Sequence, residues 1–168
     1  KLEVVMVTQK RLKELFYYND KTGQFFRMTN RGGKLKGSVA GTGSGNGYLQ
    51  ICVDKKVYLS HRLAWLYMYG EYPKKQIDHI NHIRSDNRID NLREATHHEN
   101  SKNQKLRTTN KSGVMGVWWN KQREKWEVAI KVKGRKINLG RYKTKSKAIS
   151  VRETAEILYG FHKNHGAA

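Results

Sequence analysis

Four histidines and four asparagines lie between Ile77 and Asn100, and the first histidine, His79, directly follows an aspartate, Asp78. A carboxylate is a hard oxygen donor that suits Mg²⁺ or Mn²⁺. Neighbouring side chains of an extended segment point to opposite sides of the backbone, so His79 would lie clear of a metal ion bound by Asp78. An imidazole in that position can take a proton from water as a general base. The pair therefore predicts metal-assisted hydrolysis.

Phosphodiester hydrolysis needs an activated water, neutralisation of the charge on the transition state, and stabilisation of the leaving oxygen. One divalent ion can supply the last two. Asn91 is the candidate that fixes the ring of His79 through a hydrogen bond. Asn100, in the stretch ATHHENSKN that has the character of a helix start, is the candidate second metal ligand. Two protein ligands leave coordination positions for phosphate oxygens and water, as Mg²⁺ prefers.

The elements that precede this segment are short. The stretch TQKRLKELFYY predicts a helix, with apolar residues at helical spacing behind a possible cap: Thr8, Leu12, Leu15 and Phe16. NDKTGQFF predicts a turn between strands, and GTGSGNG, residues 41–47, a hairpin tip. Two strands and a helix that ends near Gly70 follow, and the helix carries Leu63, Leu66 and Tyr67. Met6 is a candidate first residue of the native chain.

The final third of the chain has the clearest strand pattern. In KWEVAIKVK, residues 125–133, one face carries Trp126, Val128, Ile130 and Val132, and the other carries Lys125, Glu127, Ala129, Lys131 and Lys133. MGVWWN and INLGRY predict the neighbouring strands, and the following helix presents a stripe of Ala148, Val151, Ala155 and Leu158. The pattern predicts a three-stranded sheet packed on one helix, with Trp126 in the core and Trp118 more exposed than Trp119.

The charge of the chain indicates a polyanionic partner. The sequence has 34 Lys and Arg against 14 Asp and Glu, a net charge of +20. Between Lys102 and Lys147 there are 15 bases and two acids. This excess goes beyond what solubility requires, so nucleic acid is the first partner to consider. A membrane is not expected, because no apolar run reaches the length of a transmembrane span and no basic amphipathic helix stands out.

Cysteine content and the start of the chain point to the cytoplasm. Cys52 is the only cysteine, which excludes an internal disulfide and a zinc finger with two thiolates. No basic segment followed by an apolar run predicts a signal peptide. We therefore expect a cytoplasmic protein, in a bacterial or phage-infected cell.

The residues around Asp78 and His79 resemble the HNH endonuclease motif, in the variety found in phage-encoded homing endonucleases. HRLAW at 61–65 and DNRIDNL at 86–92 are also typical of that subgroup, and the resemblance runs over residues 35–105. It implies a ββα-metal fold in which the metal is held by Asp78 and Asn100, and His79 is the base that Asn91 orients. The family commonly has a glycine and an acid after DHIN, where this chain has His82 and Ile83.

The basic C-terminal region resembles the ethylene-response-factor (APETALA) DNA-binding domain of plants. The similarity runs from Lys111 to Tyr159 and rests on GV at 116 and 117, KWEVAI, KGRKINLGRY and the terminal helix. It implies that the open face of the sheet enters the major groove of DNA. The residues that would face the bases are Trp118, Asn120, Lys131 and Asn138, and those that would hold phosphates are Lys125, Lys133, Arg135 and Arg141. Several arginines of the plant pattern are tryptophan or asparagine here, so any base preference should differ.

Three other interpretations stay open at this point. His61 either touches a phosphate or caps and packs the helix that it opens. His79, His82, His97 and His98 could bind structural zinc. The chain could also be a non-enzymatic DNA-binding regulator, a restriction-type nuclease or an RNA-binding protein, although the aromatic motifs of common single-strand platforms are missing.

The sequence thus predicts an α+β protein that acts as a metal-dependent HNH DNA endonuclease. We expect three regions: a DNA-contacting helix and hairpin region over 1–60, a nuclease module over 61–105, and a DNA-binding domain over 106–168. A single Mg²⁺ or Mn²⁺ ion is the expected cofactor and double-stranded DNA the expected partner. A monomer or weak dimer with one site per chain should nick one strand.

Overall fold

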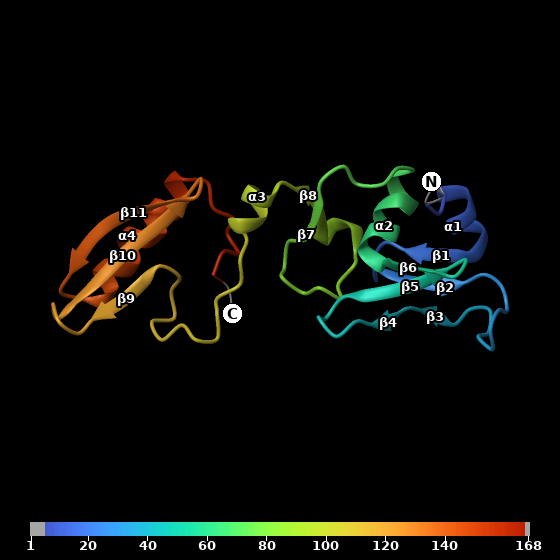
Figure 1. Cartoon of the computed structure of the whole chain (residues 1–168), viewed down its shortest axis with the longest axis horizontal. Coiled ribbons are helices and arrows are strands. Elements are labelled where there is room, and N and C mark those ends of the chain that lie inside the picture. The colour runs from blue at the N-terminus through green and yellow to red at the C-terminus, as the bar shows by residue number, and fades with distance from the viewer. Residues whose placement is uncertain (1–5, 167–168) are drawn as a thin grey trace, which may run out of the picture. The chain divides into compact units, whose positions relative to one another are not determined.

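The computed structural model describes residues 6–166, so the segment before Met6 lies outside the described residues. The chain is mixed α+β, and it folds as two compact units that meet in sequence between Thr96 and His97 (Figure 1). No helix among residues 6–166 combines the length and apolar character that a membrane crossing needs.

The first unit opens with α1 (Gln9–Leu15), which Thr8 caps as predicted, since its hydroxyl accepts a hydrogen bond from Arg11 N at 3.2 Å. Three strands form its first antiparallel sheet: β1 (Phe16–Asn19), β2 (Gln24–Arg27) and β3 (Val39–Ala40). Three more form the second: β4 (Thr42–Gly43), β5 (Leu49–Val53) and β6 (Lys56–Leu59). Within the glycine-rich stretch, Thr42 and Gly43 form β4, and the residues after them make the turn that leads to β5, as predicted.

Helix α2 (Ser60–Tyr69) packs its buried face on the core of the first unit and ends at Gly70, whose φ of +81° is left-handed. A two-stranded hairpin of β7 (Gln76–His79) and β8 (Leu92–Ala95) follows, with the 3₁₀ turn η1 (Ile89–Asn91) just before β8. One core joins the N-terminal elements to α2 and this hairpin, through Leu12, Phe16, Phe25, Ile51, Leu63, Leu66, Ile77 and Leu92. The predicted N-terminal region, as far as it is described (6–60), therefore shares a single core with residues 61–96.

The second unit contains α3 (His97–Ser101), β9 (Val117–Asn120), β10 (Lys125–Val132), β11 (Arg135–Tyr142) and α4 (Lys145–Leu158). The strands form an antiparallel sheet in the order β11-β10-β9. Helix α4 covers one face of it over a small core of Val117, Val128 and Ala148, with Trp126 packed at its edge. The predicted three-stranded sheet on one helix is confirmed, and Trp126 lies on its helix side, partly buried against the core.

The stripe predicted for α4 is right in its first part and wrong at its end. Ala148 and Ala155 are buried, but Leu158 is exposed. Arg152 is buried instead, with Nη1 donating to Ala129 O at 2.8 Å and Nε to Glu156 Oε1 at 2.8 Å. A charged residue can occupy the helix interface because these partners satisfy its guanidinium, which a pattern of apolar residues does not reveal.

Candidate functional site

Asp78 and His79 are the last two residues of β7, where the strand pairs with β8. Asp78 lies opposite Arg93 and His79 opposite Leu92, so the two side chains point to opposite faces of the hairpin, as predicted. Both are buried, with exposed fractions of 7% and 5%. A buried carboxylate next to a buried imidazole is an environment that structural hairpins seldom need.

The carboxylate of Asp78 is held by Arg93 from the facing strand. Arg93 Nε and Nη2 donate to the same oxygen, Asp78 Oδ2, at 3.0 and 2.7 Å. This ion pair compensates the buried negative charge and fixes the plane of the carboxylate. Arg93 is not in the predicted set, although its place opposite Asp78 follows once the hairpin register is known.

The ring of His79 is held by Asn87, a fully buried residue of the loop between the two strands. His79 Nε2 lies 3.2 Å from Asn87 Oδ1. An amide oxygen can only accept, so the bond requires the proton on Nε2 and makes Nδ1 the basic nitrogen of the neutral ring. Burial lowers the pKa of His79, although the Asn87 hydrogen bond opposes this. The imidazole is thus kept neutral, as a general base must be.

Asn91, the residue predicted to orient His79, fastens the loop that carries Asn87. Its Oδ1 accepts from Asn81 N at 3.0 Å and its Nδ2 donates to Asp86 O at 2.8 Å. Asn81 Nδ2 also donates to Asp86 Oδ2 at 2.7 Å. These bonds tie both sides of the loop together, so Asn91 supports the base from further away than Asn87 does. Its direct action on His79 stays a prediction.

Asn87 itself is fixed by the first hairpin of the chain. Its carbonyl accepts a hydrogen bond of 2.6 Å from Tyr18 Oη. Gly23, in the turn between β1 and β2, lies so close that a Cβ there would come within 2.5 Å of Asn87 C. No motif pointed to Asn87, because DNRIDNL offers two asparagines of the same type; only the packing of the N-terminal hairpin separates their roles.

His82 adopts a left-handed conformation, with φ of +64°, in the same loop. This is the position at which the HNH pattern that the sequence resembles commonly has glycine. Because a Cβ, and a branched one above all, costs about 1–2 kcal/mol in that region of φ, we expect His82→Val to be less stable than His82→Gly. Urea unfolding of the two variants tests this, and equal midpoints would contradict it.

His61, from the first turn of α2, lies beside the base. Its ring centroid is 5.1 Å from that of His79 and 5.2 Å from that of Tyr48. The nitrogen Nδ1 is buried and has no hydrogen-bond partner within residues 6–166. Burial, and then the neighbouring His79, lowers the pKa of His61 to about 4.

The acid stability of the first unit should depend on His61. The pKa of His61 is 6.5 in the unfolded chain and about 4 in the folded one. The contribution of neutral His61 to the free energy of unfolding is therefore fully present above pH 6.5 and is lost as the pH falls to 4. The loss is about 3 kcal/mol. We expect the free energy of unfolding to fall between pH 7 and pH 4 by about that much less in His61→Phe than in the parent, as measured by urea unfolding at both pH values. Some pH dependence should remain in the variant, because the pKa of His79 is also lowered. An equal fall in the free energy of unfolding for both proteins would contradict the prediction.

Asn100 lies on α3, in the second unit, and it is partly buried. The helix predicted from ATHHENSKN is confirmed. Asp78, His79 and Asn91 lie close together in the first unit, whereas Asn100 belongs to the second unit. Within residues 6–166 no group of three or more His, Cys, Asp or Glu residues is placed to hold a metal ion.

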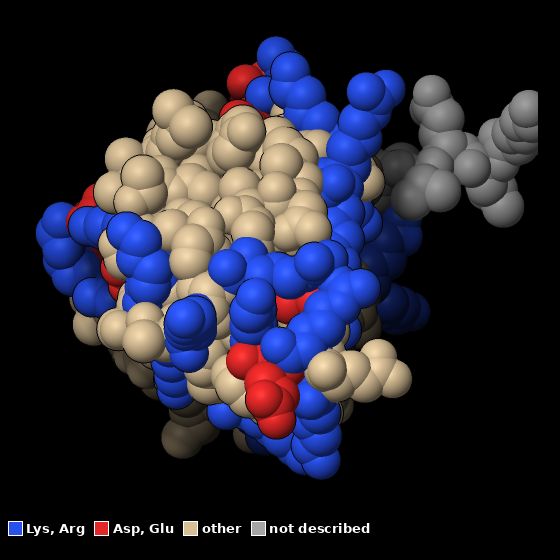
Figure 2. Space-filling view, turned by 90° about the vertical axis from the view of Figure 1, so that its left-hand side faces the viewer, with Lys and Arg blue, Asp and Glu red and all other residues tan. Residues whose placement is uncertain are grey.

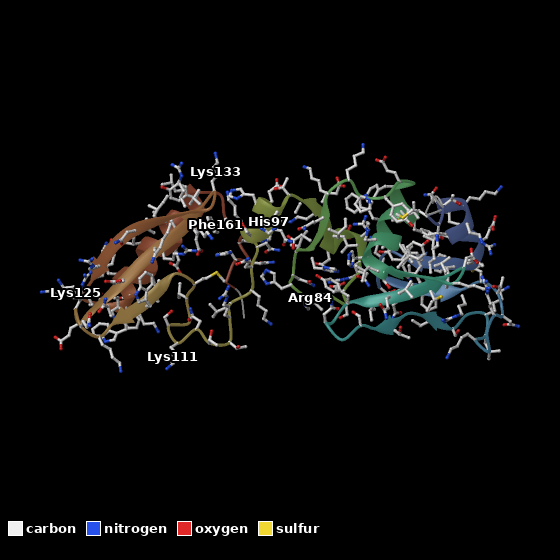
Figure 3. The ribbon with its side chains drawn as sticks, in the orientation of Figure 1. Arg84, His97, Lys111, Lys125, Lys133 and Phe161 are labelled. Atoms are coloured by element: carbon white, nitrogen blue, oxygen red, sulfur yellow. The ribbon has the colours of Figure 1, made fainter. Side chains whose placement is uncertain are left out.

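The strand register of the second unit places most of the predicted DNA contacts on the sheet face opposite α4. Glu127 pairs with Arg141 and Trp118, and Lys131 pairs with Lys136, so these residues share that open face. The predicted residues on it are Trp118, Asn120, Lys125, Lys131, Asn138 and Arg141. Lys133 lies in the turn after β10, at the opposite end of that strand from Lys125 (Figure 3). Arg135 pairs with Val132 and alternates to the helix side.

Two residues of the open face were missed by the sequence analysis. Glu127 Oε1 accepts from Asn120 Nδ2 at 3.0 Å and from Arg141 Nε at 3.2 Å, so one acid orders two predicted contacts. Lys136 Nζ lies 4.8 Å from the ring centre of Trp118. Figure 2 shows a face on which Lys and Arg side chains greatly outnumber the acidic ones.

The relative exposure predicted for the two tryptophans is wrong. Trp119 is 44% exposed, whereas Trp118 is partly buried under Lys136. Trp119 lies on the helix side and contacts Trp126, with ring centroids 5.4 Å apart. It is exposed because β9 is an edge strand that α4 covers only in part.

The comparisons with known proteins cover the part of the chain that contains this site. A model of the HNH endonuclease family matches residues 58–102, which include Asp78, His79, Asn91 and Asn100. Protein 3.8 of Escherichia phage T7 is 38% identical over 79 residues, or 46% of this chain and 65% of that protein. The chain thus spans less than two thirds of the length of this curated relative. No solved structure matches. The family match does not extend to the C-terminal sheet, whose resemblance to the plant domain stays a prediction.

Proposed function

We propose that this chain is a metal-dependent endonuclease that hydrolyses phosphodiesters of double-stranded DNA. The observation that carries the proposal is the buried Asp78 and His79 pair at the end of β7, inside the region that matches the HNH endonuclease family. The net charge of +20 supports a polyanionic substrate.

The residues of the first unit would act on the attacking water. His79 Nδ1 takes a proton from it while Asn87 holds Nε2–H. The water oxygen then bonds to phosphorus and the bond to the 3′ oxygen breaks. A divalent ion bound to a carboxylate and an amide oxygen would supply charge stabilisation at that leaving oxygen. Asp78 suits this role as an ordered carboxylate, and Asn100 is proposed as the second ligand from its spacing alone.

The second unit would position the duplex. Its open face carries Lys125, Lys136 and Arg141, which suit phosphates, beside Trp118, Asn120, Lys131 and Asn138, which would face base edges. Lys133 in the turn and Arg135 on the other face would reach phosphates only at the margin of this surface. Binding should therefore weaken steeply with salt.

We further propose a phage-type homing enzyme that acts in a bacterial cell, works as a monomer or weak dimer, and nicks one strand per site. The relative in phage T7 supports the phage setting. The DNA-binding face proposed for the second unit favours a homing enzyme over a restriction-type nuclease. A regulator without activity would use the same basic face, so the test must separate binding from cutting.

The test is to incubate the protein with supercoiled plasmid and Mg²⁺ or Mn²⁺, and to follow the topological form on a gel while DNA binding is measured in parallel. Open circles that form only with the metal are the expected product. Persistent supercoil despite tight binding would overturn the nuclease and favour the regulator.

A further inference from the structure

His61 lies in the candidate site but has no role in the reaction proposed above. It is 6% exposed, and its ring meets that of His79 edge to face, at 86° and 5.1 Å between centroids. The Tyr48 ring lies 5.2 Å from His61 and 5.8 Å from His79. Three rings from separate segments, before β5, in α2 and in β7, thus converge where the base is.

A structural role does not explain a histidine at this position. The N-cap of α2 is Leu59, and no side chain caps the helix, so His61 does not act as its cap. Its buried Nδ1 finds no hydrogen-bond partner within residues 6–166. A buried nitrogen without a partner costs free energy that a phenylalanine of similar shape would avoid.

The two nitrogens of His61 differ in what they can reach. Only Nδ1 is both buried and without a partner, so Nε2 is the nitrogen that a ligand can meet. In a neutral ring one nitrogen carries the proton, and that proton is most stable on the nitrogen that can donate it to water or a ligand. His61 therefore offers an uncharged N–H donor on Nε2.

The surroundings of this donor suit a phosphate. The guanidinium of Arg84, which is labelled in Figure 3, lies 5.0 Å from the centre of the Tyr48 ring. Arg84 Nη1 also donates to Asn46 O at 2.8 Å, which fixes the side chain there. A fixed positive charge on the outer side of Tyr48 would attract a phosphate towards the His61 and His79 rings.

We propose that His61 is a further catalytic residue, which donates a hydrogen bond from Nε2 to a non-bridging oxygen of the scissile phosphate. His79 Nδ1 takes the proton of the water at the same phosphate, so the two imidazoles have separate tasks. The bond from His61 strengthens as charge builds on that oxygen in the transition state. This inference rests on the proposed nuclease function.

Three variants of one residue test the proposal. His61→Phe keeps a ring of similar shape and removes both nitrogens. His61→Gln places an amide N–H near the position of Nε2, and His61→Asn places one near Nδ1. We expect the Phe and Asn variants to nick supercoiled plasmid about 10²-fold more slowly than the parent, as for the loss of one transition-state donor. The Gln variant should recover much of the rate.

Binding and stability are measured on the same proteins. DNA affinity in the absence of metal should be close to that of the parent in all three variants, so the loss falls on the turnover rate. Leu66→Ala, a buried change on the same helix, is the control for destabilisation and should leave the rate of the folded protein unchanged. Should the Phe variant fail to fold, the comparison of Gln with Asn still decides.

Two outcomes would overturn the proposal. If His61→Phe nicks at the parental rate, the ring has only a packing role. If Asn restores the rate and Gln does not, the donor is not Nε2. A parent protein that does not nick at all would instead refute the nuclease function, which keeps the two failures apart.

Discussion

Replacing His79 by alanine is expected to slow plasmid nicking by about 10² to 10⁴-fold, the contribution of a general base. The reason is the role proposed for this ring, in which Nδ1 accepts the proton of the attacking water while Nε2–H donates to Asn87 Oδ1. The rate is measured as loss of supercoiled plasmid under saturating DNA. DNA affinity should stay nearly unchanged, because the phosphate contacts proposed for the second unit remain.

The matched control is His97→Ala, which removes an exposed histidine of the second unit. It should leave the nicking rate unchanged and thereby show that the loss is specific to His79. Full activity of the His79→Ala protein would mean that another group activates the water, and the assignment of the base would be wrong.

Gly23→Ala is expected to destabilise the first unit by about 2–5 kcal/mol, through left-handed strain and overpacking together. Gly23 has φ of +71°, and an added Cβ would lie 2.4 Å from Arg88 N. The neighbour is backbone, so it cannot swing aside as a side chain would. Any shift of that backbone also moves Asn87, and the folded fraction should therefore nick more slowly than the parent. Urea unfolding gives the first quantity and plasmid nicking the second.

Gly32→Ala is the control for Gly23→Ala, because Gly32 also has a positive φ of +56° but nothing within 4 Å of an added Cβ. It should show the conformational strain without the clash. If both variants lose the same stability, the contact between the first hairpin and the catalytic loop does not matter energetically.

Local pattern was enough to predict several parts of the molecule. Alternation along β7 separated Asp78 from His79, and alternation along β10 placed the small C-terminal sheet on its helix. The cap at Thr8 and the helix end at Gly70 depend on neighbours in sequence, so they too could be read in advance. The family resemblance placed the nuclease region, and the HNH match over 58–102 confirms it there.

Other side-chain positions depend on contacts between residues far apart in sequence, which the local sequence pattern does not reveal. Asn87 holds His79 because Tyr18 and Gly23, far away in sequence, fix its backbone. Arg152 replaces Leu158 in the helix interface because Ala129 and Glu156 satisfy its charge. Trp119 is exposed because it lies on the edge strand β9, which α4 covers only in part. None of these partners can be recognised from residue type and spacing.

The Arg93 to Asp78 pair has a consequence for the protein before it meets any ion. Proteins whose ligands are uncompensated in the apo form often need the metal in order to fold. Here a guanidinium already neutralises the carboxylate, through two bonds of 3.0 and 2.7 Å to one oxygen. If the proposed nuclease function holds, a chelator should therefore abolish nicking without unfolding the first unit, because the hairpin that carries Asp78 is already stable without the ion.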